Sequence, residues 1–223
     1  MSISEEIAEV LIQKYVKNHS VVSLGTSEHA LKFLKKLAFK IEEENLDIEL
    51  VPTSAKMAVI ASSFGLPLVS VNEKEIDFAL EFASLADYNF DFVKHETHSL
   101  IRDKMIAQSA EKLFVVCEKK HFVKQVYGKV PFEISTFGWK RTLVQLDAFG
   151  KASLRKKNGQ AEKTESGNFL IDVNLDFSHS LHEIDVVSKN IPGVIETGIF
   201  PGYADYLVLT HGSKITMKSR VQK

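Results

Sequence analysis

A chain of 223 residues, 44% of them hydrophobic, with 11 glycines and 5 prolines, can bury a core in one or two domains and is too apolar for long disordered stretches. The formal net charge of -1 supplies no general field that would attract nucleic acid or an anionic membrane, so neither is expected as a partner. The single cysteine, Cys117, excludes an intramolecular disulfide, and its apolar neighbours predict a buried core position. Because no run approaches the roughly 18 apolar residues of a membrane span, and the first residues lack the basic start of a signal peptide, we expect a cytoplasmic protein.

The first half of the chain alternates short apolar runs with helical patterns, which predicts parallel strands joined by right-handed helical crossovers. An opening helix capped by Ser2 or Ser4 is expected to end near Asn18. Ser54 and Gly65 have the residue types of a helix N-cap and of the residue that follows a helix end. The further helices are expected over residues 30–41, 54–64 and 98–110, and the strands over residues 21–25, 47–52, 67–71, 76–83 and 113–117. The sequence therefore predicts a doubly wound, mostly parallel, Rossmann-like α/β sheet.

The second half, from Lys129, has a different order of elements. The pattern predicts, in chain order, a strand at 130–135, a helix at 138–149, strands at 151–156 and 168–175, a helix at 180–190 and a strand at 193–200. This β-α-β-β-α-β order is typical of a ferredoxin-like arrangement, and the polar tract 156–167 would be its exposed hairpin connection. A strand at 205–210 could return to the first sheet. The predicted domains are therefore a Rossmann-like domain of residues 1–128 and 203–223 and an inserted ferredoxin-like domain of residues 129–202.

Several stretches resemble one known family. They are residues 76–105, the strand and glycine turn at 21–30, the run Ser166-Gly-Asn-Phe-Leu-Ile-Asp172, the run Ile191-Pro-Gly-Val-Ile195 and the run Gly198-Ile-Phe200. Together they resemble the ribose 5-phosphate isomerase type A family. The resemblance implies a doubly wound α/β domain that carries a smaller ferredoxin-like lid, a homodimer or homotetramer, a small-molecule sugar phosphate as partner, and no metal or organic cofactor.

The resemblance also implies a chemistry and the residues that perform it. The family interconverts ribose 5-phosphate and ribulose 5-phosphate, a reaction of the pentose phosphate pathway, through an enediolate that needs a base, an oxyanion contact and a phosphate cradle. The family's catalytic glutamate lies in a Leu-Arg-Glu-Lys turn, and the run Ile101-Arg-Asp-Lys104 places Asp103 there as the base. Lys94 matches the lysine of a Lys-Gly-Gly-Gly segment and would contact the oxyanion. Glu81 keeps a carboxylate at a matching strand end and would assist ring opening.

Other positions of the implied substrate site carry residue types that differ from the family pattern. The phosphate loop Gly-Thr-Gly-Ser-Thr-Ala becomes Gly25-Thr-Ser-Glu-His-Ala30, in which Glu28 opposes a phosphate dianion. The glycines that follow Lys94 become larger residues without easy access to positive φ. Asp103 is one methylene shorter than glutamate, a loss of reach of roughly 1.5 Å. The expected substrate-binding residues are Thr26, Ser27, Glu28, His29, Ser84, His95, Glu96, Thr97 and His121.

Three functions remain open from the sequence alone. The first is a ribose 5-phosphate isomerase, with activity that is weak or lost. The second is a family paralogue that has lost catalysis and serves as a binding or assembly subunit. The third is a divalent-metal-binding protein, because imidazole and carboxylate side chains at the carboxyl ends of parallel strands suit zinc. The ligands of that alternative would be His29, His95, His98 and His121, beside Glu28, Glu81 and Asp103.

Overall fold

The structure is a computed structural model that describes residues 5–175, 180–212 and 214–220, without the side chain of Glu28. The chain divides into two compact units. The first unit comprises Met1–Phe82, Met105–Phe122 and Ala204–Lys223, and the second comprises Ala83–Lys104 and Val123–Tyr203. The caps predicted at Ser2 and Ser4 lie outside the described residues. The domain bounds expected from the sequence, at 128/129 and 202/203, stay a prediction.

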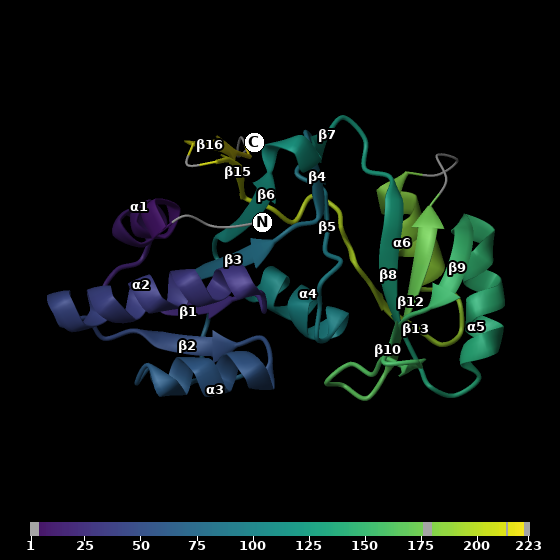
Figure 1. The fold of residues 1–223 in the computed structure, drawn as a ribbon, viewed down its shortest axis with the longest axis horizontal. Helices are drawn as coiled ribbons and strands as arrows, with labels where there is room; N and C mark the ends of the chain where they lie inside the picture. Colours follow the sequence, from purple (N-terminus) through teal and green to yellow (C-terminus); the bar gives the residue numbers. More distant parts are fainter. Residues whose placement is uncertain (1–4, 176–179, 213, 221–223) are drawn as a thin grey trace. The chain divides into compact units, whose positions relative to one another are not determined.

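The first unit contains a six-stranded, mostly parallel sheet (Figure 1). Its strands, in spatial order, are β16 (Lys214–Ser219), β15 (Tyr206–His211), β6 (Leu113–Glu118), β3 (Phe78–Phe82), β1 (Val21–Leu24) and β2 (Glu49–Pro52). Neighbouring strands pair in parallel, except β15 and β16, which pair antiparallel. The predicted α/β class with a mostly parallel sheet is therefore confirmed, and so is the return of the strand near residue 206 to this sheet.

Three helices of the first unit are α1 (Glu5–Tyr15), α2 (Glu28–Glu44) and α3 (Ala55–Ser63). In α2 the three-to-four spacing of Phe33, Leu34 and Leu37 gathers fully buried side chains on one face, which explains its amphipathic sequence. Phe33 stacks on Phe78 of β3, whose ring in turn stacks on Phe114 of β6. The apolar face of α2 is thus part of the core of the first unit. Cys117 is buried, as expected.

The second unit contains a four-stranded antiparallel sheet with two helices. Its elements in chain order are β8 (Gly128–Ile134), α5 (Trp139–Leu146), β9 (Gly150–Leu154), β12 (Phe169–Leu175), α6 (Leu181–Ser188) and β13 (Val194–Thr197). The strand order β13-β8-β12-β9 gives the β-α-β-β-α-β topology that the sequence predicts. Alternate residues of β8, such as Phe132, share one core with Leu146 of α5 and Ile184 of α6. The residues between them, including Glu133, therefore point to the opposite face of this sheet.

Short elements complete the structure. They are α4 (Leu100–Ser109), the strands β4 (Leu85–Asp87), β5 (Phe92–Val93), β7 (Phe122–Val123) and β14 (Ile199–Phe200), the hairpin β10 (Lys156–Lys157) and β11 (Gln160–Ala161), and the 3₁₀ turns η1 (Lys119–His121) and η2 (Asp147–Phe149). Strands β14, β5, β4 and β7 form a small sheet in that order. Within the described ranges, no helix is long and apolar enough to cross a membrane.

The structure corrects two predicted strands. Residues 67–71 form no strand but only a single bridge between Leu50 and Leu68, because Pro67 has no N–H to donate and the chain turns directly afterwards. The expected strand 193–200 is divided at Gly198 into β13 and β14, which belong to different sheets. A Cβ at Gly198 would lie 2.6 Å from Cγ of Pro131 and 2.8 Å from the carbonyl oxygen of Lys94, so only glycine permits this close approach.

Candidate active site

A buried ion pair lies at the start of α4 in the second unit. Lys94 follows β5 directly, and Asp103 is the fourth residue of α4. Nζ of Lys94 lies 2.9 Å from Oδ1 of Asp103, and the two side chains are only 2% and 4% exposed. Removal of two charges from water is costly unless the pair has good geometry and further hydrogen bonds, so such a pair is more typical of a functional site than of a stabilising element. The two side chains that the resemblance implies as base and oxyanion contact are therefore in direct contact.

Thr97 supplies the second contact of the carboxylate. Its Oγ1 donates a hydrogen bond to Oδ2 of Asp103 over 2.6 Å. Among the described residues, Oδ1 of Asp103 thus contacts an ammonium and Oδ2 accepts a hydrogen bond from a hydroxyl. Thr97 is expected from the sequence to bind substrate, but the structure directs its hydroxyl to the side chain of Asp103.

The main chain around Lys94 is held by hydrogen bonds on several sides. The amide of Lys94 donates to the carbonyl of Gly198 over 3.0 Å, and the amide of His95 donates to Oγ of Ser84 over 3.1 Å. Nη1 of Arg155 donates to the carbonyl of His95 over 3.0 Å. Ser84 and His95, both expected to bind substrate, thus have a role in fixing the segment that carries Lys94.

Arg155 also joins this segment to β12. Its guanidinium forms two parallel hydrogen-bond contacts with the buried carboxylate of Asp172, which Nζ of Lys129 approaches to 3.0 Å. Burial alone would raise the pKa of Asp172, but the hydrogen bonds and charges of Arg155 and Lys129 together outweigh burial and hold that pKa below its usual value. The fork-shaped guanidinium suits this bidentate role better than a lysine would.

His95 has a half-buried ring beside Arg155. Its Nε2 is buried and has no hydrogen-bond partner among the described residues. Burial lowers the pKa of His95, and the positive charge of Arg155 lowers it further. The imidazole is therefore expected to be neutral at physiological pH.

Glu133 binds the N-terminus of α4. Its side chain is fully buried, yet it accepts hydrogen bonds from Oγ of Ser99 and the amide of Ile101, both 3.2 Å away, within the first turn of the helix. Oγ1 of Thr164 and Nδ2 of Asn168 donate to the same carboxylate over 2.7 and 2.9 Å. Four donors and the positive end of the helix dipole together compensate the buried charge. Glu133 therefore fixes the helix start from which Asp103 extends.

Lys104, next to Asp103 in the sequence, points to a separate buried network. Its Nζ lies 2.9 Å from Oδ1 of Asp185 and 2.7 Å from Oε1 of Glu196. Burial lowers the pKa of Lys104, although the charges of Glu196 and Asp185 act in the opposite direction. Through these contacts Lys104 fixes α4 at the position that follows Asp103.

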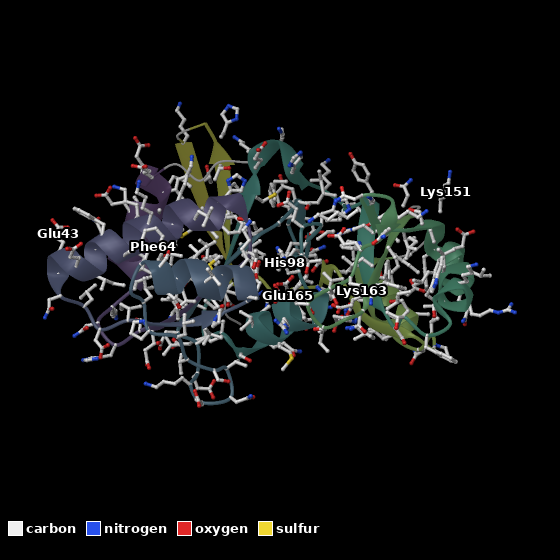
Figure 2. All side chains as sticks on the ribbon, turned by 60° about the horizontal axis from the view of Figure 1, so that its bottom comes forward. Glu43, Phe64, His98, Lys151, Lys163 and Glu165 are labelled. Carbon is white, nitrogen blue, oxygen red and sulfur yellow. The ribbon has the colours of Figure 1, made fainter. Side chains whose placement is uncertain are left out.

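The remaining predicted residues of the second unit are more exposed. Glu96 is exposed, and Nδ1 of His98 lies 3.6 Å from Oε1 of Glu165 (Figure 2). Arg102 donates to the other oxygen of Glu165 over 2.7 Å. Because these pairs are exposed, each contributes about 0–1 kcal/mol to stability.

The predicted phosphate loop lies in the first unit, between β1 and α2. Ser27 has extended backbone angles and caps α2, because its Oγ accepts hydrogen bonds from the amides of His29 and Ala30, both over 3.1 Å. Thr26 is buried, and its Oγ1 lies 2.6 Å from Oγ of Ser54 and 2.9 Å from Oγ1 of Thr53. Ser54 also caps α3, so the two helix N-termini that follow the adjacent strands β1 and β2 are connected by hydroxyl groups.

Glu81 lies beside this loop. The amide of Gly25 donates to the carbonyl of Leu80 over 2.8 Å, and a Cβ at Gly25 would overlap the carboxylate of Glu81. The Glu81 side chain is only 1% exposed. Glycine at position 25 is therefore what leaves room for the longer carboxylate of this chain.

The four histidines of the metal-binding alternative are divided between the two units. His29 packs its ring against Phe82, with centroids 5.8 Å apart, and His121 lies in η1, where its Nδ1 is buried and lacks a hydrogen-bond partner in the described part of the chain. His29 and His121 belong to the first unit, whereas His95 and His98 belong to the second. Among the residues that the structure describes, no group of three or more His, Cys, Asp or Glu side chains could hold a metal ion. The side chain of Glu28 lies outside the described part.

Sequence reasoning missed Glu133, Arg155 and Thr53 as parts of these arrangements. A signal existed for Glu133, because a single carboxylate inside the apolar strand Val-Pro-Phe-Glu-Ile must find buried donors. Arg155 and Thr53 gave no comparable signal, since their partners lie far away in the sequence.

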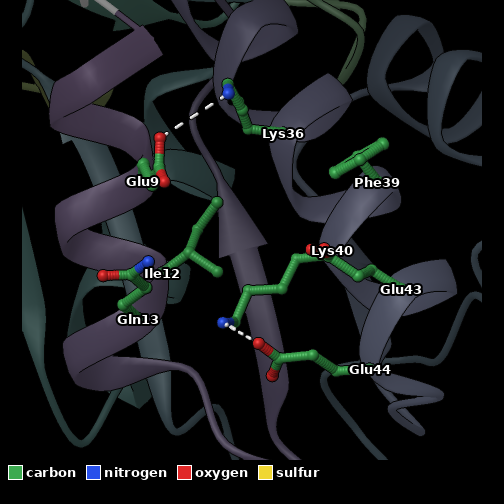
Figure 3. Close-up of a pocket in the computed structure, with 8 residues that line it drawn as sticks. All are labelled: Glu9, Ile12, Gln13, Lys36, Phe39, Lys40, Glu43 and Glu44. Carbon is green, nitrogen blue, oxygen red and sulfur yellow. Dashed lines mark hydrogen bonds and ion pairs between the residues drawn. The ribbon is translucent and has the colours of Figure 1, made fainter.

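A surface hollow of about 90 Å³ lies between α1 and α2, and none of its lining residues is a predicted site residue (Figure 3). Its lining residues are Glu9, Ile12, Gln13, Lys36, Phe39, Lys40, Glu43 and Glu44. Lys36 pairs with Glu9 and Lys40 with Glu44, which accounts for four of the five charged side chains around it.

The chain is therefore an α/β protein. Its buried carboxylate–ammonium pair, at the start of a helix, is suited to general acid–base chemistry. A model of the family ribose 5-phosphate isomerase A (phosphoriboisomerase A) matches residues 49–214. Ribose-5-phosphate isomerase A of Streptococcus uberis is 31% identical over 212 residues, which cover 94% of each chain. The chain belongs to the ribose 5-phosphate isomerase A family, as the resemblance of its motifs predicts.

Solved structures agree with this assignment. A D-ribose-5-phosphate isomerase in complex with phospho-erythronic acid superposes with a TM-score of 0.90 at 28% identity over 97% of each chain. Ribose 5-phosphate isomerase from Plasmodium falciparum gives a TM-score of 0.90 at 23% identity over 98% of each chain, a likeness of fold.

Proposed function

We propose that the protein interconverts ribose 5-phosphate and ribulose 5-phosphate, with Asp103 as the base. The observation that carries the proposal is the buried contact between Lys94 and Asp103, on residues that match the catalytic motifs of the family to which the chain belongs. General acid–base catalysis requires the base and the charged group that stabilises the intermediate to be close together and shielded from water. Both side chains meet these requirements.

In the proposed reaction, the Asp103 carboxylate removes the proton from C2 of the open-chain aldose. The electron pair of the broken C–H bond forms the C1–C2 double bond, and the carbonyl oxygen on C1 becomes the oxyanion of an enediolate. The ammonium of Lys94 stabilises that oxyanion. Asp103 then returns the proton to C1, the C2 oxygen becomes the carbonyl of the ketose after it transfers its proton to the C1 oxygen, and no cofactor takes part. Glu81 is proposed to assist ring opening of the sugar.

The other proposed contacts with the sugar phosphate are Thr26, Ser27, Glu28, His29, Ser84, His95, Glu96 and His121. What supports them is their position in segments that match the family pattern, and phosphate binding by amides at a helix N-terminus such as that of α2 is a general mode. A homodimer or homotetramer and a cytoplasmic location, both expected from the sequence, remain part of the proposal.

The proposal is tested by the turnover of ribose 5-phosphate by the pure protein, with Asp103→Asn as the comparison. We expect turnover by the wild type and a loss of at least about a hundredfold in kcat in the variant, because the amide cannot accept the proton. The variant also removes the charge that faces buried Lys94, which can cost about 3–5 kcal/mol, so circular dichroism must show that it is folded at the assay temperature. Equal residual rates in both proteins would mean a contaminating host isomerase and would refute the proposal.

A second measurement uses phospho-erythronic acid, the ligand of one solved relative. If the site accepts phosphorylated sugar acids, this compound competes with ribose 5-phosphate and raises its apparent KM without changing kcat. No observation favours the catalytically inactive subunit or the metal-binding protein over the isomerase.

A further inference from the structure

Thr97 donates its hydroxyl to Oδ2 of Asp103, whereas the close contact of Lys94 is with Oδ1. The two contacts are short, with 2.6 Å from Oγ1 of Thr97 to Oδ2 and 2.9 Å from Nζ of Lys94 to Oδ1. A carboxylate attached through a single methylene rotates about χ2 in a broad well. One donor on each oxygen fixes the plane of the carboxylate, and with it the direction of the remaining lone pairs.

We infer that Thr97 is a positioning residue for the base, a role that rests on the proposed function; threonine stands here in place of the third glycine of the Lys-Gly-Gly-Gly segment. Proton transfer from carbon depends on the alignment of the base with the C–H bond, and a displacement of about 1 Å can cost on the order of a hundredfold in rate. Threonine suits this role because its β-branched side chain has few χ1 rotamers. After donation to Asp103, its oxygen still has acceptor lone pairs for a substrate hydroxyl.

The hydroxyl of Thr97 does not serve to cap α4. Among the contacts of the described residues, the amide of Ile101 donates to Glu133 and the amide of Asp103 donates to the carbonyl of Ser99, so neither of these two amides uses the Thr97 hydroxyl. Helix capping is the usual role of a threonine before a helix. Because other groups perform that role here, the Asp103 contact is what the Thr97 hydroxyl provides.

The test compares Thr97→Val with Thr97→Ser in the full chain. Valine keeps the branched shape and removes the hydroxyl, whereas serine keeps the hydroxyl. We expect Thr97→Val to lower kcat for ribose 5-phosphate by about ten- to a hundredfold with KM changed by less than about threefold, because an interaction with the base acts mainly in the transition state. Thr97→Ser is expected to recover most of kcat. Incorporation of deuterium from D₂O into the sugar at C1 and C2, followed by NMR, should fall and recover in parallel.

Thr142→Val is the matched control. Thr142 is a buried threonine of the same unit, and its hydroxyl donates to the carbonyl of Pro192 over 3.0 Å. This variant loses a hydrogen bond of similar kind, so we expect lower thermal stability and an unchanged kcat.

The outcomes separate the role of Thr97 from the isomerase function itself. If the wild type turns over substrate and Thr97→Val is equally fast, the positioning role is overturned while the isomerase function stands. An equal loss in Thr97→Val and Thr97→Ser would assign the effect to packing and also overturn it. A wild type without turnover would overturn both.

Discussion

Asp103 contacts its partners with a shorter side chain than the glutamate of the family turn, so its environment has to define its position closely. Lys94, Thr97 and the first turn of α4 supply that environment through hydrogen bonds and burial. The chain can therefore keep a working base if the substrate comes correspondingly closer to α4. This requirement makes kcat sensitive to single side chains that do not themselves take up the proton.

Ser27 offers a test of the phosphate loop at the level of one hydroxyl. Its Oγ accepts hydrogen bonds from the amides of His29 and Ala30. Without this hydroxyl, the two amides would be available to an anion at the N-terminus of α2. Because glycine is a tolerated N-cap, Ser27→Gly should cost only a few tenths of a kcal/mol in stability. We predict that it lowers KM for ribose 5-phosphate by about two- to fivefold and leaves kcat unchanged, because in the proposal the loop binds the phosphate through its amides, for which the Ser27 hydroxyl competes.

Ser180→Gly provides the control for this prediction. Ser180 caps α6 in the same way, with its Oγ 3.2 Å from the amide of Glu183, and lies in the second unit. It should lose similar stability without a change in KM. A higher KM in Ser27→Gly would instead indicate that the hydroxyl itself binds the phosphate.

Residues that act through distant partners could not be predicted from the sequence. The short-range caps at Ser54 and the apolar face of α2 follow from local spacing, and both are confirmed. The motifs predict Lys94 and Asp103, but the hydrogen bond from Thr97 depends on the path of the turn between them. Sequence patterns define elements well and define the directions of individual hydroxyl groups poorly.

Among the elements, α4 depends on Glu133 of β8 for its start. We predict that Glu133→Gln destabilises the protein by about 1–3 kcal/mol in urea unfolding. Four groups donate hydrogen bonds to the Glu133 carboxylate, and the amide nitrogen of glutamine cannot accept from those that face it. Hydrogen exchange of the Ile101 amide should accelerate in the variant. Glu42→Gln, which changes an exposed carboxylate of α2, is the control and should lie within about 0.5 kcal/mol of the wild type.

Exchange at Ile101 as slow as in the wild type would show that α4 does not need the buried carboxylate.

The two corrected strands are also differences between predicted and observed elements. The division at Gly198 follows from its close approach to Pro131, a residue far away in the sequence, so the local sequence does not show that the chain changes sheets there.

For the molecule as a whole, the chain passes from one compact unit to the other at 82/83, 104/105, 122/123 and 203/204. The core of the second unit includes Val93, and Glu133 needs donors from Ser99 and Ile101. We therefore predict that residues 123–203 alone do not form a stable fold, since they lack these groups. Dispersed NMR signals and a cooperative unfolding transition from that fragment would contradict the prediction.

A matched fragment joins residues 83–104 to residues 123–203 through a flexible linker. It restores Val93, Ser99 and Ile101, and should unfold cooperatively. The difference between the two fragments measures how much of the second unit depends on the segment that carries Lys94 and Asp103.

The place of β15 in the first sheet has a consequence for how the protein folds during its synthesis. This strand lies between β6 and β16, yet it comes at residues 206–211, after the whole length of chain that builds the second unit. While a ribosome translates that intervening length, the apolar strand β6 has an open edge that other nascent chains could pair with. Slow translation or a shortage of chaperones should therefore reduce the yield of this protein through aggregation before its folding is complete.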